Sequence, residues 1–294
     1  MTTPRLFCFG LGYSARRLAL RLMSEGWQVA ATVRDRESIE KLEGLGIEVF
    51  PFDREHPLEN PKAKLKGTTH LLSSVPPDGD GDTVLDLHSG TIADLGHTFK
   101  WIGYLSTTGV YGNRNGDTVN EGDALAPTSA RAHQRVEAES RWLGLNAHIF
   151  RIAGIYGPGR GVLEDVRRGR ARRIDKTGQV FSRIHVDDLG QVIAASMSVP
   201  EAGAIYNVCD DEPAPPIQVV TYACELLGVR PPPVQSFDEA KKEMSPMALT
   251  FWADNKRVDN SRIKEDLGVR LSYPDYRQGL RAIIQGSGCK PVEQ

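Results

Sequence analysis

The chain has 294 residues, of which 40% are hydrophobic and 25% charged, with a formal net charge of −2. This length allows one large domain or two unequal ones, and the near-neutral charge argues against a nucleic-acid binder held by bulk charge. The four cysteines form no CxxC pair and have no metal-like spacing; they are Cys8, Cys209, Cys224 and Cys289. We therefore expect free thiols in a reducing compartment, with neither disulfides nor zinc.

The N-terminal sequence MTTPRLFCFGLGYSA enters an apolar strand and a glycine turn almost at once, which leaves no room for a signal peptide. No run of about 18 apolar residues follows, so no membrane span is predicted. From these two features we expect a cytoplasmic protein.

Apolar runs alternate with longer stretches of helical period in the first half of the chain. The runs predicted to be strands are 5–10, 27–33, 47–52, 69–74, 101–106 and 146–151. Helical periodicity, closing on glycines, marks 14–26, 38–46 and 82–96. This alternation predicts the α/β class, with a Rossmann-like doubly wound parallel sheet covered on both faces.

After Phe150 the alternation loosens. The expected elements are a loop over 151–161, a strand and helix over 180–197, a last strand at 204–208, and helices near 218–228, 259–268 and 273–284. We therefore assign 1–154 plus about 180–209 to an NAD(P)-binding Rossmann domain. The remainder, about 155–179 plus 210–294, is predicted to be a small substrate-binding lobe.

A GxGxxA motif formed by Gly10, Gly12 and Ala15 stands between the first strand and the first helix. In this context it predicts a dinucleotide site. Gly10 permits the tight turn, Gly12 lets the backbone approach a pyrophosphate, and Ala15 allows close packing of helix and strand. The amides of the first helical turn, which includes Tyr13 and Ser14, would meet the negative charge.

Arg34 stands at the end of the second strand, where an acidic residue would bind a ribose 2′-hydroxyl. A guanidinium there, with Arg36 nearby, suits a 2′-phosphate, so NADP is favoured over NAD. Asp35 leaves NAD open as the alternative, in which Arg34 is a solvated loop charge.

Several motifs, in order and over nearly the whole chain, resemble the extended short-chain dehydrogenase/reductase superfamily, the nucleotide-sugar epimerases and dehydratases. They are YLSTTGVYG, FRIAGIYGPG, SRIHVDDLGQVI and AIYNVCDDEP. The resemblance places Thr107 on the catalytic Ser/Thr that holds a substrate oxygen, and Ser73 and Ser74 beside the cofactor. It also implies a homodimer through the helices that follow the fourth and fifth strands.

The chain departs from this family where the family has its catalytic tyrosine and lysine. Arg131 occupies the tyrosine position and Arg135 the lysine position. Arginine stays protonated at working pH and cannot exchange a proton as a tuned phenol does. Gly154 also replaces a common asparagine, and Phe9 replaces the first glycine of GxxGxxG. The chain is therefore identified as an atypical member of the NAD-dependent epimerase/dehydratase type.

Arg131 and Arg135 share a helix face, where like charges repel unless an anion lies opposite. One hypothesis is that they bind a phosphate or carboxylate of the substrate. The alternative is a solvated helix with ordinary surface pairs, Arg135 with Glu139 and Glu137 with Arg141.

Other candidates for chemistry are weaker. Tyr111 and Tyr156 lie in segments where the family uses tyrosine for packing, His133 is on another helix face, and His185 suits a structural role. Five arginines from Arg167 to Arg173 are typical first of a solvated face, then of an anion site, and last of RNA binding. The segment Asp78–Asp82 resembles a calcium loop but has Ser89 where a glutamate is needed, which favours a turn near the cofactor.

Two functions therefore stand. The first is an NADP-dependent oxidoreductase or epimerase-like enzyme for a small anionic, nucleotide-sugar-like substrate, in which Thr107 orients the substrate and Arg131 or Arg135 binds its charge. The second is a regulatory or scaffold protein that binds NADP without turnover. Neither requires a metal, a nucleic acid or a membrane.

Overall fold

The computed structural model describes residues 3–35 and 37–286, so Arg36 and Cys289 lie outside the described residues. The chain divides into two compact units. The first comprises Met1–Thr107, Ala130–Arg151 and Gly190–Tyr206, and the second Thr108–Ser129, Ile152–Leu189 and Asn207–Gln294. The domain bounds predicted from sequence stay a prediction. The segments 108–129, 152–154, 180–189 and 207–209, which were assigned to the Rossmann domain, lie in the second unit here.

The strands of the main sheet follow the order β11-β7-β5-β4-β1-β2-β3. Their bounds are β1 Arg5–Phe9, β2 Gln28–Val33, β3 Glu48–Pro51, β4 His70–Ser73, β5 Trp101–Thr107, β7 His148–Ile152 and β11 Ile205–Val208. The β1–β2, β1–β4, β2–β3 and β4–β5 pairs are parallel. Every strand predicted for this sheet is present, and the α/β Rossmann-like class is confirmed.

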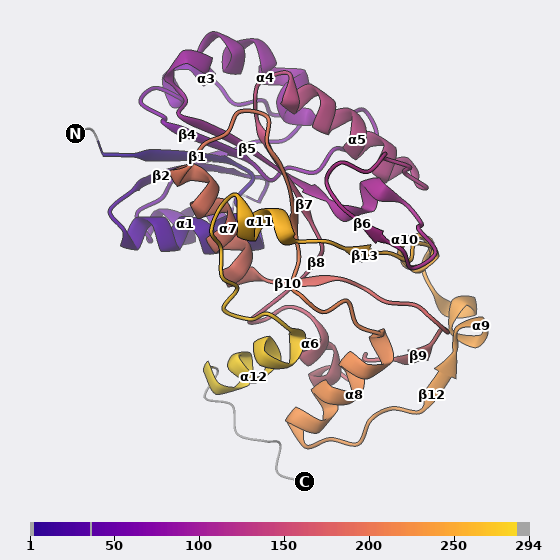
Figure 1. The fold of residues 1–294 in the computed structure, drawn as a ribbon. Coiled ribbons are helices and arrows are strands. Elements are labelled where there is room, and N and C mark those ends of the chain that lie inside the picture. The colour runs from indigo at the N-terminus through magenta and orange to yellow at the C-terminus, as the bar shows by residue number, and fades with distance from the viewer. Residues whose placement is uncertain (1–2, 36, 287–294) are drawn as a thin grey trace. The chain divides into compact units, whose positions relative to one another are not determined.

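Helices cover both faces of this sheet, with α4 and α5 on one side and α1 on the other (Figure 1). The helical segments here are α1 Tyr13–Ser24, α2 Glu37–Glu43, α3 Pro61–Lys64, α4 Thr83–Asp94, η1 Gly96–Thr98, α5 Ala130–Leu143 and α7 Val186–Ser198. Helix α1 buries Ala15, Leu18, Ala19 and Leu22, which recur at helical spacing. Gly26 follows its C-cap with φ +87°, a conformation that glycine adopts at little cost.

Aromatic side chains fill the core of the first unit. The Phe7 and Phe9 ring centroids on β1 lie 5.0 Å apart, and Phe9 meets Phe52 edge-on at 5.5 Å. Tyr104 on β5 stacks on Trp142 of α5 at 5.6 Å. The Tyr104–Trp142 contact helps to fix α5 against β5, because each buried aromatic ring removes a large apolar area from water.

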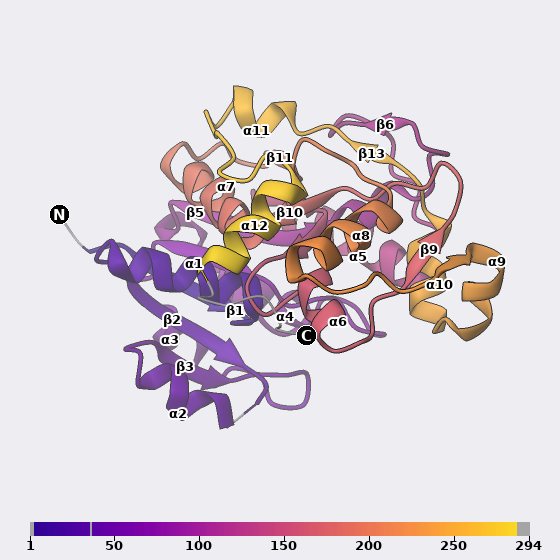
Figure 2. The same cartoon turned by 90° about the horizontal axis from the view of Figure 1, so that it is seen from below.

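The second unit has short parallel strand pairs and several helices (Figure 2). The strands are β6 Thr118–Val119, β8 Gly154–Tyr156, β9 Arg173–Asp175, β10 Arg183–His185, β12 Val234–Ser236 and β13 Arg257–Val258. The helices are η2 Thr108–Tyr111, α6 Val162–Arg167, α8 Pro216–Leu227, α9 Phe237–Ala240, η3 Lys241–Glu243, α10 Pro246–Ala253, α11 Ser261–Glu265 and α12 Tyr276–Gly286. No helix in the described part of the chain is long and apolar enough to cross a membrane.

One sequence expectation for this unit is wrong. The segment 151–161 was expected to be a loop, but it contains β8, which pairs with β10 so that Ile155 lies opposite Ile184. A strand this short shows no alternation of apolar and polar residues, so only its tertiary partner defines it.

Candidate functional site

The glycine turn between β1 and α1 lines a cavity in the first unit. Gly10 has φ +80°, and a Cβ there would come within 3.0 Å of the Val75 side chain. A Cβ on Gly12 would meet no heavy atom within 4 Å. The two glycines therefore differ in role, because Gly10 allows the turn whereas Gly12 lets a ligand approach the backbone.

Two hydroxyl groups hold this turn in place. The Gly10 amide donates to Thr32 Oγ1 at 2.8 Å, and the Ser74 hydroxyl donates to the Gly10 carbonyl at 2.6 Å. Ser73 is buried, and its hydroxyl has no hydrogen-bond partner among the described residues. Of the two serines expected beside the cofactor, Ser74 lines the cavity and Ser73 belongs to the buried strand β4.

At the start of α1, Gly12 and Arg16 line the cavity, whereas Tyr13, Ser14 and Ala15 are not part of its wall. Gly12 is the N-cap and offers no side chain, and Tyr13, Ser14 and the buried Ala15 form the first helical turn. The positive end of the helix dipole is therefore directed toward Gly12, which favours an anion there.

The cavity has a volume of about 930 Å³, within the range of cofactor sites. Four basic side chains line it, and besides Arg54 they are Arg16 on α1, Arg34 after β2 and Lys41 on α2. None of the three forms an ion pair within residues 3–35 and 37–286. Sequence reasoning missed Arg16 and Lys41, whose only signal was their place on the two helices that flank β2.

Most acidic groups in the cavity wall are engaged elsewhere. Asp35 accepts the Glu37 amide and the Ser38 hydroxyl, both at 2.9 Å. Asp53 accepts the His56 amide at 2.8 Å. The exception is Glu55, which is exposed. The wall therefore carries charges of both signs, and Arg16, Arg34 and Lys41 are the cations in it that a phosphate could bind.

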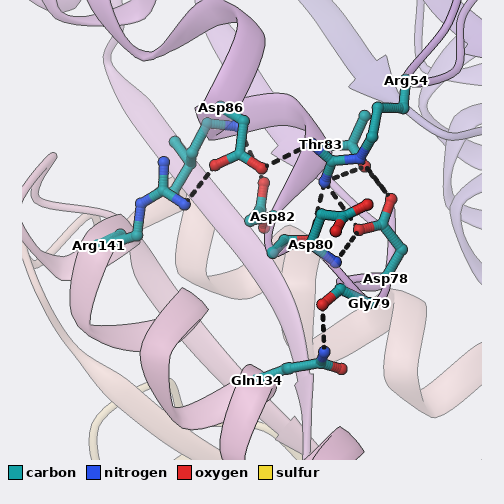
Figure 3. Close-up of polar contacts among 11 residues, drawn as sticks. Arg54, Asp78, Gly79, Asp80, Asp82, Thr83, Asp86, Gln134 and Arg141 are labelled. Carbon is teal, nitrogen blue, oxygen red and sulfur yellow. Dashed lines mark hydrogen bonds and ion pairs between the residues drawn. The ribbon is translucent and has the colours of Figure 1, made fainter.

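An ion-pair network fixes the loop that follows β4 (Figure 3). Arg54 pairs with Asp78 at 2.8 Å and with Asp86 at 2.9 Å, and Asp86 also pairs with Arg141 of α5 at 2.7 Å. The hydrogen bonds from Arg54 hold the pKa of the Asp78 carboxyl well below its usual range. The acidic segment expected to be a turn near the cofactor thus forms part of the cavity wall.

Two more contacts tie this loop to α5. Gln134 donates to the Gly79 carbonyl at 3.2 Å, and the Trp142 indole donates to Asp82 at 2.9 Å (Figure 3 shows the first). Asp82 also caps α4 by accepting the Leu85 amide. No group of three or more His, Cys, Asp or Glu in the described ranges is placed to hold a metal ion.

Thr107, Arg131 and Arg135 all belong to the first unit, at the end of β5 and on α5. Thr107 is half-buried. Arg131 is exposed and has no ion-pair partner in the described part of the chain. Arg135 instead donates from Nη1 to the Leu105 carbonyl at 2.7 Å and to the Tyr104 hydroxyl at 3.2 Å. The two arginines therefore differ, since only Arg135 is docked on the sheet.

The surface pairs considered for α5 are not formed. Glu139 is 2% exposed; it accepts the Ser106 hydroxyl at 2.5 Å and pairs with Arg151 at 2.9 Å. Arg141 pairs with Asp86 rather than with Glu137. A buried carboxylate needs a charged or hydrogen-bonding partner, and the sheet supplies it, so this helix face is packed rather than solvated.

The tyrosines weighed as proton donors are both buried in the second unit. The Tyr111 hydroxyl donates to Asn207 at 2.8 Å. Tyr156 packs against α12, where a Cβ on Gly279 would come within 2.1 Å of its hydroxyl. Burial raises the pKa of Tyr156. The His185 ring contacts the Tyr273 ring at 4.1 Å, which agrees with a structural role.

The arginine-rich segment of the second unit is largely paired. Arg167 binds Glu164, Arg170 binds Asp165, and Arg172 binds Glu243. Arg173 lies in β9 and donates to the Pro232 carbonyl at 3.2 Å. Most of these arginines are therefore bound to local acids or backbone carbonyls and do not form one unpaired basic face.

The second unit also contains a cavity of about 390 Å³, which sequence reasoning did not anticipate. Its wall includes Tyr156, Phe181, Arg183, Phe251 and Tyr276. These residues come from five separate elements or loops, so no local motif could have indicated it.

Comparison with known proteins places the fold. Protein YeeZ of Escherichia coli K12 is 30% identical over 283 residues, covering 90% of this chain and 95% of that protein. A functionally unknown conserved protein from Silicibacter pomeroyi is 49% identical, with a TM-score of 0.90 over 97% of this chain and 99% of that one. No family model matches the chain.

A more distant solved structure shares the fold alone. The dTDP-glucose 4,6-dehydratase of Bacillus anthracis, in complex with NAD, has a TM-score of 0.74 at 15% identity over 97% of each chain. The chain therefore shares the overall fold of this dehydratase.

Proposed function

The chain belongs to the same family as protein YeeZ of Escherichia coli, and we propose that it binds NADP in the cavity of the first unit. The observation that carries this proposal is the set of basic side chains Arg16, Arg34 and Lys41, which line the cavity without ion-pair partners among the described residues. A 2′-phosphate would supply their counter-charge, whereas the ribose hydroxyl of NAD would not.

The residues present fit such a cofactor. Gly12 and the first turn of α1 would hold the pyrophosphate, and Arg34 with Lys41 would hold the 2′-phosphate. The bound nicotinamide would supply hydride transfer. The distant dehydratase of the same fold was crystallised with NAD, which supports a nicotinamide dinucleotide here.

We propose further that the protein is an oxidoreductase or epimerase-like enzyme for a small anionic, nucleotide-sugar-like substrate. The Thr107 hydroxyl would orient a substrate oxygen by a hydrogen bond. Arg131, which is exposed and without an ion-pair partner in the described ranges, would bind the negative charge of the substrate. Neither arginine would transfer the proton, because a guanidinium stays protonated at neutral pH.

The second candidate is a protein that binds NADP without turnover, in a regulatory or scaffold role. The docking of Arg135 on the Leu105 carbonyl favours it, since this side chain then stabilises the helix instead of facing a reactant. The absence of a tyrosine at position 131 supports the same candidate.

Calorimetric titration with NADPH and with NADH tests the cofactor proposal. We expect NADPH to bind at least about tenfold more tightly, as one charge-assisted contact is worth about 1.4 kcal/mol or more. Arg34→Ala and Lys41→Ala should each remove most of this preference and leave NADH unchanged. Arg21→Ala is the matched control, since Arg21 pairs with Glu25 on α1 outside the cavity wall. Equal binding of the two cofactors by the unaltered protein would contradict the proposal.

Turnover separates the two candidate functions. The NADPH complex is mixed with a panel of carbonyl compounds, including sugar nucleotides, and the ultraviolet absorbance of the reduced nicotinamide is followed. Loss of absorbance with one compound supports the enzyme. Stoichiometric binding with unchanged absorbance across the panel supports the non-catalytic function.

A further inference from the structure

The cavity of the second unit has the features of a separate ligand site. It is bounded by β8, β10, α6, α8, α10 and α12, all of which belong to that unit. Its volume, about 390 Å³, is near the lower end of the range for small-molecule sites. A dinucleotide would not fit this volume, but a single substituted ring would.

Aromatic side chains form much of the cavity wall. The Phe181 and Phe251 ring centroids lie 4.4 Å apart, and Tyr156 and Tyr276 also line the cavity. Phe251 on α10 is 56% exposed although it is part of this wall. A planar ring placed beside Phe251 would remove its exposed face from water and gain stacking contacts.

One cation in the wall retains hydrogen-bonding capacity. The Arg183 Nη1 atom donates to the carbonyls of Phe181 at 2.7 Å and Ala214 at 3.2 Å. Its Nε and Nη2 atoms donate to none of the residues that the structure describes. The side chain is half-buried and lines the cavity. The guanidinium of Arg183 is therefore held through Nη1, while Nε and Nη2 are available to donate hydrogen bonds to a ligand.

No nearby acid in the described ranges forms an ion pair with Arg183. Asp165, which also lines the cavity, pairs with Arg170 at 3.1 Å. Asp210 is 1% exposed, and no side chain in the described ranges donates to its carboxyl group. Burial raises the pKa of Asp210 to about 8.

We propose that this cavity binds a small aromatic carboxylate, with the ring against Phe181 and Phe251 and the carboxylate accepting hydrogen bonds from Arg183. The positive guanidinium selects for the anion, and the aromatic wall selects for the planar ring. This site uses residues of the second unit only, so the test of this proposal is independent of the NADP proposal.

Fluorine NMR of 4-fluorobenzoate, added to the full chain in the presence of saturating NADPH, tests the proposal. We expect saturable broadening of the fluorine signal. The uncharged 4-fluorobenzyl alcohol should bind at least about tenfold more weakly, since it lacks the charge-assisted hydrogen bonds. No saturable binding of the benzoate, or equal binding of the two probes, would overturn the proposal.

Two exposed side chains of the same helix give a matched pair of variants. Phe251→Ala should weaken 4-fluorobenzoate about tenfold through loss of the ring contact. Met247→Ala should leave it unchanged, because Met247, 64% exposed, is not part of the cavity wall. Equal affinities in the two variants would place the probe elsewhere and refute the site.

Arg183→Met tests the charge directly. Circular dichroism first shows whether this variant is folded, because Arg183 also binds two backbone carbonyls. A folded variant should lose the preference for benzoate over the alcohol, and retention of that preference would contradict the role of Arg183. If the variant does not fold, the Phe251 and Met247 pair still decides the question.

Discussion

The glycine turn and helix α5 lie in the same unit but differ in whether their charged side chains have binding partners within the protein. At the turn, Arg16, Arg34 and Lys41 line the cavity without ion-pair partners among the described residues. On α5, the polar side chains that face β5 are already bound, Arg135 to the Leu105 carbonyl and Glu139 to Arg151. The first region retains the capacity to bind a charged ligand, whereas most of the second is used to hold the fold together.

Under the proposed function, cofactor binding and proton transfer would depend on different parts of this unit. The turn depends on backbone conformation and small residues, which this chain keeps at Gly10, Gly12 and Ala15. Proton transfer depends on one side chain with a suitable pKa, and Arg131 does not provide it.

The largest expected effect concerns the buried acid of α5. Glu139→Ala should lower the free energy of unfolding by about 3–5 kcal/mol, because it leaves the Arg151 charge buried and unpaired. Chemical denaturation measures this change. Glu137→Ala, an exposed position on the same helix, is the control and should change stability by less than about 0.5 kcal/mol. Similar effects of the two substitutions would show that α5 is not held as described.

The glycine turn should show the reverse behaviour, with binding lost and stability kept. Gly12→Val should weaken NADPH binding by about 100-fold, or about 2.7 kcal/mol, because the side chain would occupy the approach to the backbone. The melting temperature should change little, since a Cβ there meets no heavy atom within 4 Å. Gly90→Val on α4, outside the cavity wall, is the matched control for calorimetry. Undiminished NADPH affinity in the Gly12 variant would remove the turn from the cofactor site.

Substitutions of the two arginines of α5 should differ in their effect on the free energy of unfolding. Arg135→Met should cost about 1.5 kcal/mol, since it removes charged hydrogen bonds to Leu105 and Tyr104. Arg131→Met, at an exposed position one turn earlier, should cost less than about 0.5 kcal/mol. Urea denaturation compares them. Equal costs would mean that Arg135 is not docked on β5 in solution.

The smallest expected effect is that the stabilisation provided by the Arg54–Asp78 pair in the cavity wall depends on pH. The pKa of Asp78 is lowered by Arg54, so the stabilisation is present above the unfolded pKa of about 3.9 and is lost as the pH falls below it. The free energy of unfolding of Asp78→Asn should therefore lie below that of the unaltered protein at neutral pH, and this difference should become smaller as the pH is lowered. Urea denaturation between about pH 3 and pH 7 measures this. A stability difference that stays constant over this range would show that the Arg54 pair is not formed.

Much of the first unit could be predicted from the sequence. The strands of the main sheet are apolar runs, and α1 ends at Ser24, just before the Gly26 that signals its end. The two arginines Arg131 and Arg135 were visible as well. Their different environments were not, because Arg131 and Arg135 have the same local sequence signal and differ only in what lies opposite.

The sequence by itself therefore determined the α/β class and the glycine turn, since each depends on local periodicity or on residue type at one position. The tertiary structure alone decided that Glu139 is a buried partner of Arg151, that Lys41 joins Arg34 at one cavity, and that Phe251 and Arg183 meet at another. The physical reason is that charge pairing and cavity walls join residues far apart in the chain. No periodic pattern specifies which of them come together.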